Sequence, residues 1–143
     1  LAELPDDTQR RDRAAEMATQ HRQARQPVPG FGHHLHKPDD PRAQRLLELA
    51  DELDLTTGHV PALRILAQEV DRAAGKHITV NATGAVAALL GEIGIPVAIM
   101  RGFAVVSRAA GLVAHIAEEQ QTPSGRYIWD LVDRNVPQTE GGT

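Results

Sequence analysis

The residues with the most evident chemistry lie together between residues 27 and 42, where the chain reads PVPGFGHHLHKPDDPR. Three histidines stand almost side by side, at His33, His34 and His36. An imidazole can transfer a proton near neutral pH or bind a metal. Gly30 and Gly32 let the backbone come close to a ligand and adopt positive φ angles. Lys37 and Arg42 carry charges that can hold phosphate or carboxylate groups.

Three interpretations of this stretch are open. A metal site would need further ligands, and no H-E-x-x-H motif accompanies the histidines, so we expect no metal here. A ligand-binding loop would use backbone groups to read a flat polar ring, and a histidine as acid or base. A turn rich in proline and glycine, with incidental histidines, is the third interpretation.

Two arginines interrupt a later segment that is otherwise apolar. Arg101 and Arg108 are seven residues apart, which places them on roughly the same side of a helix. A buried arginine needs an anionic partner. We therefore expect either an anionic ligand or a core salt bridge to one of Glu92, Glu118 and Asp130.

Composition narrows the classes of protein that are possible. The 143 residues suffice for one domain with a real core, and with only 3% aromatic residues that core must be aliphatic, which favours packed helices. The net charge of −4 and the lack of a Lys/Arg block predict no nucleic-acid partner. The absence of cysteine fits a cytoplasmic location. The longest stretch without Asp, Glu, Lys or Arg, residues 77–91, is too short to span a bilayer, so we expect no membrane segment.

Apolar periodicity predicts about six helices and almost no sheet, which makes the fold class all-α. The expected helices cover residues 6–26, 41–55, 61–74, 82–93, 97–121 and 126–133. Asp40 and Pro41 suit the start of the second helix, and Asn81 suits the cap of the fourth. The first helix has a thin apolar stripe, so we expect it to lie on the surface or against something outside this chain.

Three segments together resemble the citrate synthase superfamily. They are PGFGHHLHKPDDPRA (29–43), ITVNATGAVAALLGEIGIP (78–96) and GFAVVSRAAGLVAHIAEE (102–119). Their order and spacing are similar to the C-terminal half of that family, and the third segment with Trp129 and Asp130 looks closest to the citryl-CoA lyase branch. The resemblance implies a mostly helical enzyme, usually a dimer, that makes or breaks the carbon–carbon bond between acetyl-CoA and oxaloacetate.

The resemblance also implies a division of the chain. Residues 1–26 would lead in from an upstream part, and residues 27–96 would form the CoA-binding loop and helices of a small domain. Residues 97–143 would be C-terminal helices that return to the large domain, with a tail. Because the chain opens at Leu1 and its first helix is weakly amphipathic, we expect a fragment that does not catalyse alone.

Site residues follow from the resemblance position by position. His33 matches the histidine that hydrogen-bonds the oxaloacetate carbonyl and moves the proton at that oxygen. Arg42 and Arg108 match carboxylate-binding arginines, and Lys37 stands where a basic residue lies near the CoA phosphates. The loop whose backbone would read the CoA adenine consists of Val28, Pro29, Gly30, Phe31 and Gly32.

Two departures from the family pattern bear on catalysis. Asn81 stands where the family has the aspartate that takes or returns the acetyl-CoA methyl proton. An amide cannot carry that proton, although it can hydrogen-bond an enolate, and capping of a helix is the alternative role. A second catalytic histidine, in a His-Gly-Gly-type segment, has no counterpart in residues 1–26.

These features support one main hypothesis about function and three alternatives. The first is the C-terminal part of a citryl-CoA lyase-like enzyme, with His33 and Asn81 as its catalytic residues. The alternatives are an inactive acyl-CoA-binding or regulatory module, a citrate synthase proper, which is an acyltransferase, and a helical interaction domain with a metal-bound histidine loop. We expect no permanently bound cofactor, coenzyme A as part of the thioester substrate, citrate or oxaloacetate as the other ligand, and a homodimer.

Overall fold

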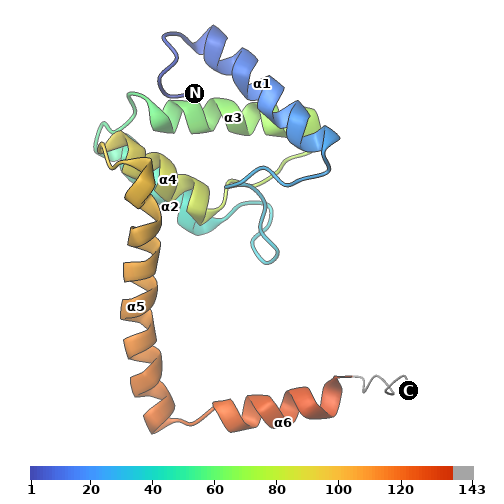
Figure 1. Ribbon diagram of the computed structural model, residues 1–143, viewed down its shortest axis with the longest axis vertical. Coiled ribbons are helices and arrows are strands. Elements are labelled where there is room, and N and C mark those ends of the chain that lie inside the picture. Colours follow the sequence, from blue (N-terminus) through green and yellow to red (C-terminus); the bar gives the residue numbers. More distant parts are fainter. Residues whose placement is uncertain (137–143) are drawn as a thin grey trace. The chain divides into compact units, whose positions relative to one another are not determined.

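The computed structural model describes residues 1–136, which form six helices and no strand, so the predicted all-α class is confirmed (Figure 1). The helices are α1 (Asp7–Gln23), α2 (Pro41–Glu52), α3 (His59–Ala74), α4 (Ala82–Glu92), α5 (Val97–Gln121) and α6 (Gly125–Asn135). Each lies within a few residues of its predicted range. Most of the expected tail, residues 137–143, lies outside the described residues.

The chain divides into two compact units, Leu1–Met100 and Arg101–Thr143. In the first unit α1 lies alongside α3, while α4 packs against both α2 and α3 (Figure 1). The thin apolar stripe of α1 thus finds its partner within the chain, because the buried Ala14 and Ala18 let the helices approach closely. Arg11 adds a polar contact at 3.0 Å from the side chain of Gln68 on α3.

Two apolar clusters fill the first unit. One is centred on Ala18, Phe31 and Val70, and the other on Ala50, Val60 and Ala88. Leu63 of α3 packs against both of them, so the clusters form a continuous interior beneath the 27–42 loop. All members except Phe31 are aliphatic, in line with the aromatic-poor composition.

Side chains cap the starts of the helices in this unit. Asp40 and Asn81 cap α2 and α4 as predicted, and Gly75 ends α3 in the left-handed region with φ of 67°. The start of α3 has no cap of its own. Instead Glu92, at the end of α4, accepts hydrogen bonds from Gly58 N at 3.0 Å and Val60 N at 2.7 Å. Burial alone would raise the pKa of Glu92, but these hydrogen bonds outweigh it and lower that pKa.

We expect Glu92→Ala to lower the free energy of unfolding by about 1–2 kcal/mol, because two backbone N–H groups of α3 lose their acceptor. Since folding lowers the Glu92 pKa, this stabilisation is present above its ordinary pKa of 4.5 and is lost as pH falls through the folded value. Urea unfolding at neutral and acidic pH measures both effects. Glu48→Ala is the control, because that exposed carboxylate contacts only Arg45 at the surface, and an equal loss there would contradict the capping role.

The second unit consists of α6 and most of α5, and its apolar side chains are exposed, among them Trp129 at 75%. Arg101 and Arg108 are exposed as well, so the expected burial of these arginines is wrong, and Glu92 is bound by α3 instead. By length and composition alone, α5 could cross a membrane. The same properties are typical of a core helix in a larger protein, so the expectation of no membrane segment stays a prediction.

Candidate functional site

The 27–42 loop is attached to the residues that lead into α4. Gly32 N donates to Thr79 O at 2.7 Å, and Asn81 N donates to Gly30 O at 3.0 Å. Phe31 and Val80 face each other between these bonds as an isolated antiparallel bridge. The bridge pairs Val80 with the loop outside any sheet in the described residues.

Two glycines allow this loop to touch the first turn of α4. Gly30 adopts a φ of 87°, which disfavours any residue with a side chain. A Cβ atom on Gly84 would lie 2.6 Å from the carbonyl oxygen of Gly30. Because both contacting groups are backbone, neither can move aside, and the distance between loop and helix is set by direct contact.

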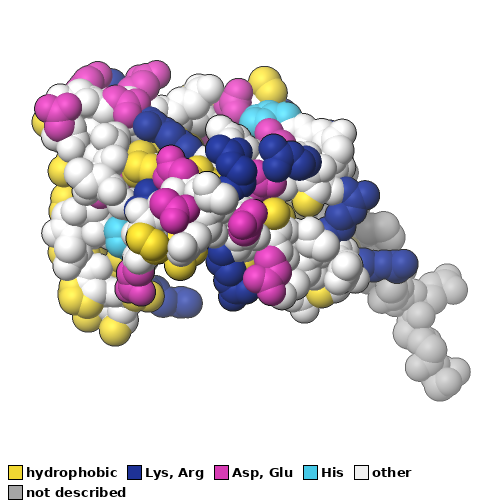
Figure 2. Space-filling view, turned by 90° about the horizontal axis from the view of Figure 1, so that it is seen from above, with side chains coloured by type: hydrophobic (Ala, Val, Ile, Leu, Met, Phe, Trp, Pro, Cys, Tyr) yellow, Lys and Arg dark blue, Asp and Glu magenta, His cyan; other side chains and the backbone are white. Residues whose placement is uncertain are grey.

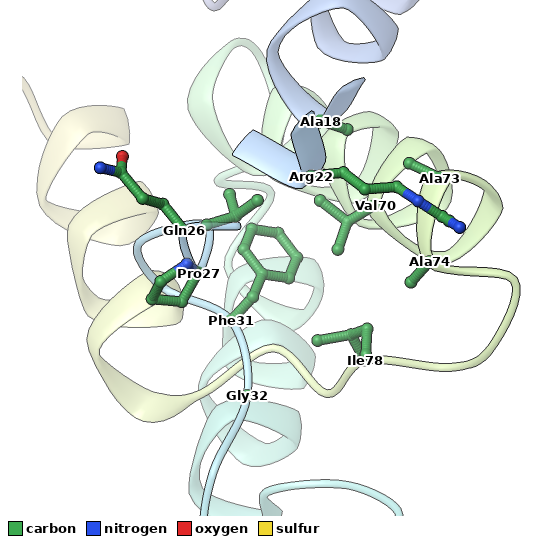
Figure 3. A pocket seen from close by; sticks show the side chains of 11 residues that line it. Ala18, Arg22, Gln26, Pro27, Phe31, Gly32, Val70, Ala73, Ala74 and Ile78 are labelled. Atoms are coloured by element: carbon green, nitrogen blue, oxygen red, sulfur yellow. The ribbon is translucent and has the colours of Figure 1, made fainter. Parts of the chain in front are cut away.

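A pocket of about 420 Å³ opens beside the loop, between the ends of α1 and α3. Figure 3 shows the ring of Phe31 at its centre, facing Val70 and Ile78, with the Arg22 side chain running along the wall formed by α3. Its lining residues are Ala18, Arg22, Gln26, Pro27, Val28, Phe31, Gly32, Val70, Ala73, Ala74 and Ile78. Three of the five predicted adenine-reading residues, Val28, Phe31 and Gly32, therefore line one mainly apolar hollow.

His33 follows this loop and is surrounded by hydrogen-bond donors. Its Nδ1 lies 3.1 Å from both Leu35 N and His36 N, and its Nε2 lies 3.2 Å from Arg42 Nη2. Burial lowers the pKa of His33, and the neighbouring imidazoles of His36 and His34 and the Arg42 guanidinium lower it further. Because Nδ1 accepts from the loop backbone, the proton of the neutral ring lies on Nε2. A second proton, on Nδ1, would face the two backbone donors, so His33 is held in its neutral form.

Arg42 is oriented by the carboxylate two residues before it. Its Nε and Nη2 donate to the two oxygens of Asp40 at 2.9 and 2.8 Å, a bidentate pair. This contact places Nη2 next to His33 and leaves Nη1 for another anion. The predicted catalytic histidine and one predicted carboxylate-binding arginine therefore lie together.

Asp40 does more than the predicted capping of α2. It is fully buried, and besides Arg42 it accepts hydrogen bonds from the backbone N–H groups of Arg42 and Ala82, which begin α2 and α4. Its own N–H donates to the buried hydroxyl of Thr79 at 3.0 Å. Hydrogen bonds from Arg42 hold the pKa of Asp40 far below its ordinary value, although burial opposes this shift. The Asp-Pro-Arg spacing signals one cap, but no local signal in the sequence indicates the second.

Asn81 lies in the same network. Its Oδ1 accepts from Gly84 N at 3.1 Å, which is the predicted cap, and its Nδ2 donates to Gly32 O at 3.0 Å. The second contact joins the side chain directly to the 27–42 loop and was not predicted.

The remaining predicted residues lie further out. Lys37 is exposed on the loop, and Arg108 lies on α5 in the second unit. The rings of His34 and His36 lie 4.8 and 4.5 Å from that of His33, so they flank it rather than converge on a common point.

Neither a metal centre nor a cationic stripe stands out in the part of the chain that is described. Among residues 1–136, no group of three His, Asp or Glu side chains is arranged to hold a metal ion. On the face shown in Figure 2, basic and acidic side chains are interspersed. The expectations of no metal and no nucleic-acid partner stay predictions.

Comparisons with known proteins agree with this geometry. The family described as "Citrate synthase, C-terminal domain" matches residues 2–129. The solved structure of citryl-CoA lyase from Hydrogenobacter thermophilus matches with 30% sequence identity and a TM-score of 0.75, over 91% of this chain and 51% of that one. The chain thus spans about half the length of that lyase. No curated protein sequence matches. With nine-tenths of its length covered by the family and by a lyase structure, this chain belongs to the citrate synthase superfamily and is similar to its citryl-CoA lyase branch.

Proposed function

We propose that this chain supplies the CoA-binding loop and one catalytic histidine of an enzyme that cleaves citryl-CoA into acetyl-CoA and oxaloacetate. The observation that carries the proposal is the contact between a neutral His33 and Arg42, next to a loop that borders an apolar pocket. The similarity to a citryl-CoA lyase supports this direction over synthesis, and the incomplete coverage of that lyase indicates that the reaction needs further residues.

The His33–Arg42 pair suits an oxygen atom that changes its proton during the reaction. An oxygen bound between His33 Nε2 and Arg42 Nη2 could accept from the guanidinium and share a proton with the imidazole. In citryl-CoA this oxygen would be the hydroxyl. Arg42 Nη1 would bind a carboxylate of the same citryl group. A carboxylate-binding role for Arg108, which lies in the second unit, stays a prediction.

Cleavage then follows a balanced course. The hydroxyl proton leaves to water, the oxygen forms the carbonyl of oxaloacetate while it accepts a hydrogen bond from His33 Nε2, and the electron pair of the carbon–carbon bond moves to the acetyl-CoA part as an enolate. Protonation of the enolate carbon completes acetyl-CoA. The lowered pKa of His33 favours this role, because only the neutral ring can accept at Nδ1 from the loop backbone while it donates from Nε2 to the substrate oxygen.

The loop and its pocket are suited to the nucleotide end of the thioester. Val28 and Phe31 of the loop line the mainly apolar pocket of about 420 Å³, and Arg22 lines it as well. A flat heterocycle would bury its faces there and find backbone groups at its edge. The exposed Lys37 on the same loop would lie near the phosphates.

A CoA-binding module without catalysis is the second candidate. It is favoured by Asn81, because the amide that stands in place of the family's aspartate is occupied with two backbone groups. The homodimer and the cytoplasmic location stay predictions for the whole protein.

The test is to measure binding and turnover separately. We expect this chain to bind CoA in a calorimetric titration, and we expect the polypeptide that contains it to release oxaloacetate from citryl-CoA. Binding by the chain without turnover in the larger polypeptide would favour the module. Absence of CoA binding in both would contradict the proposal, and faster condensation than cleavage would identify a synthase.

A further inference from the structure

The amide of Asn81 connects two backbone groups that belong to different parts of the site. On one side Oδ1 accepts from Gly84 N at 3.1 Å, in the first turn of α4. On the other side Nδ2 donates to Gly32 O at 3.0 Å, in the loop. The side chain is half-buried, and its own backbone N–H donates to Gly30 O at 3.0 Å.

Among side chains of this size only an amide satisfies both contacts. Gly84 N–H needs an acceptor and Gly32 C=O needs a donor, and Asn offers one of each. An ionised aspartate would accept from Gly84 equally well, but its second oxygen would stand against the carbonyl oxygen of Gly32. A serine could cap α4, but its hydroxyl is too short to reach Gly32 as well.

We propose that Asn81 is a positioning residue, which holds the loop against α4 and thereby sets the affinity for the CoA nucleotide. The part of the proposal that concerns CoA rests on the proposed function, whereas the attachment of the loop does not. Asn81 acts through Gly32 and the loop rather than on the reacting carbon. The close contact of Gly30 with Gly84 makes this attachment effective, because the two backbones already touch and the amide needs only to keep them together.

Two other roles make different predictions. If Asn81 only caps α4, then Asn81→Ser and Asn81→Asp should both behave like the wild-type chain, since serine and aspartate are equally good caps. If position 81 needs only a carboxylate in order to act as the base, the loop should stay attached in Asn81→Asp. This variant should then catalyse exchange of the acetyl-CoA methyl protons with solvent.

The first measurement needs no ligand. Gly32 N–H is bonded to Thr79 O, so its rate of hydrogen–deuterium exchange reports whether the loop stays attached. We expect Asn81→Ser to exchange at Gly32 about 3- to 10-fold faster than the wild-type chain, the range that corresponds to one lost hydrogen bond. Thr83→Ala is the matched control, because Thr83 is exposed in the same turn of α4, and it should leave the exchange unchanged.

The aspartate variant adds a pH dependence that a cap alone would not produce. In Asn81→Asp the protonated carboxyl group could still donate to Gly32 O, whereas the ionised carboxylate could not. The Gly32 carbonyl opposes ionisation of the introduced carboxyl and the Gly84 N–H favours it, and the attachment is present when the carboxyl is protonated and lost as pH rises through its pKa. We expect Gly32 in Asn81→Asp to exchange faster than in the wild-type chain at about pH 8, and the difference to shrink as pH falls toward the ordinary aspartate pKa of about 4.

Titration with CoA itself tests the consequence for binding. At the higher pH we expect both variants to bind CoA about 3- to 10-fold more weakly than the wild-type and Thr83→Ala chains. Wild-type exchange at Gly32 in both variants would overturn the proposal, as would unchanged CoA affinity in variants whose loop is loosened. If the wild-type chain does not bind CoA, the proposed function fails, and the exchange measurement still decides whether Asn81 holds the loop.

Discussion

Replacing His33 by alanine should lower the rate of citryl-CoA cleavage by about 10²- to 10⁴-fold, the usual contribution of a positioned acid–base group. The variant removes the group that shares the hydroxyl proton and leaves the loop and Arg42 in place. We therefore expect the effect in kcat, with little change in CoA affinity. The measurement is oxaloacetate release by the polypeptide that contains this sequence, together with a CoA titration of each variant.

His34→Ala is the matched control for this experiment. His34 is exposed and its ring stacks on that of His33 at 4.8 Å, but the hydrogen bonds to His33 Nδ1 come from the backbone of Leu35 and His36. Turnover should be nearly unchanged. Equal losses in the two variants would show that the imidazoles act as a group, and wild-type turnover in His33→Ala would disprove the role of His33.

The same reasoning gives the direction of the pH profile. The surroundings of His33 lower its pKa from the ordinary 6.5, so the neutral ring persists to lower pH than that of a free histidine. Activity that depends on it should fall on the acid side below pH 6.5 rather than near neutrality. His33→Ala should remove this limb from whatever activity remains.

Asp40→Asn should be the most destabilising single change in the first unit, with a fall in Tm of roughly 10–20 °C. The side chain is fully buried, and its two oxygens accept from Arg42 and from the first residues of two helices. An asparagine would turn one acceptor into a donor that faces other donors, in a place that water does not reach. Thermal unfolding followed by circular dichroism measures the change.

Asp51→Asn is the control for Asp40→Asn. Asp51 pairs with Arg64 at 2.7 Å, a distance close to that between Asp40 and Arg42, but it is exposed and caps nothing in the first unit. Its loss should change Tm by no more than a few degrees. Because folding lowers the Asp40 pKa, its contribution is present above the ordinary value of 3.8 and is lost only below it. A Tm difference that vanished at neutral pH would contradict this account.

The parts of the fold that the sequence predicts are those that depend on neighbours along the chain. Caps such as Asp40 for α2 and Asn81 for α4 act over two or three residues, and apolar spacing acts over single turns, so the helix ranges were predictable. The packing of α1 was not, because two buried alanines look like a weak stripe until the surface of α3 is known.

The contacts within the candidate site were even less predictable from the sequence than the packing of α1. The loop, His33 and Arg42 stand out by residue type, and the resemblance to a known family assigns them roles. The contacts that orient them join residues far apart in the chain, such as Asp40 with Ala82 and Asn81 with Gly32. No periodicity or motif encodes such distances, so the second cap of Asp40 and the attachment of the loop emerge only from the folded chain.

The distribution of aromatic residues has a practical consequence. Trp129, the only tryptophan in the sequence, stands 75% exposed on α6, and the single tyrosine, Tyr127, lies on the same helix. Fluorescence excited in the near ultraviolet therefore reports on α6 alone, with the red-shifted emission of an indole in water. A shift of that emission to the blue would signal that another surface has covered α6, so the association of α6 with such a surface can be followed without any added label.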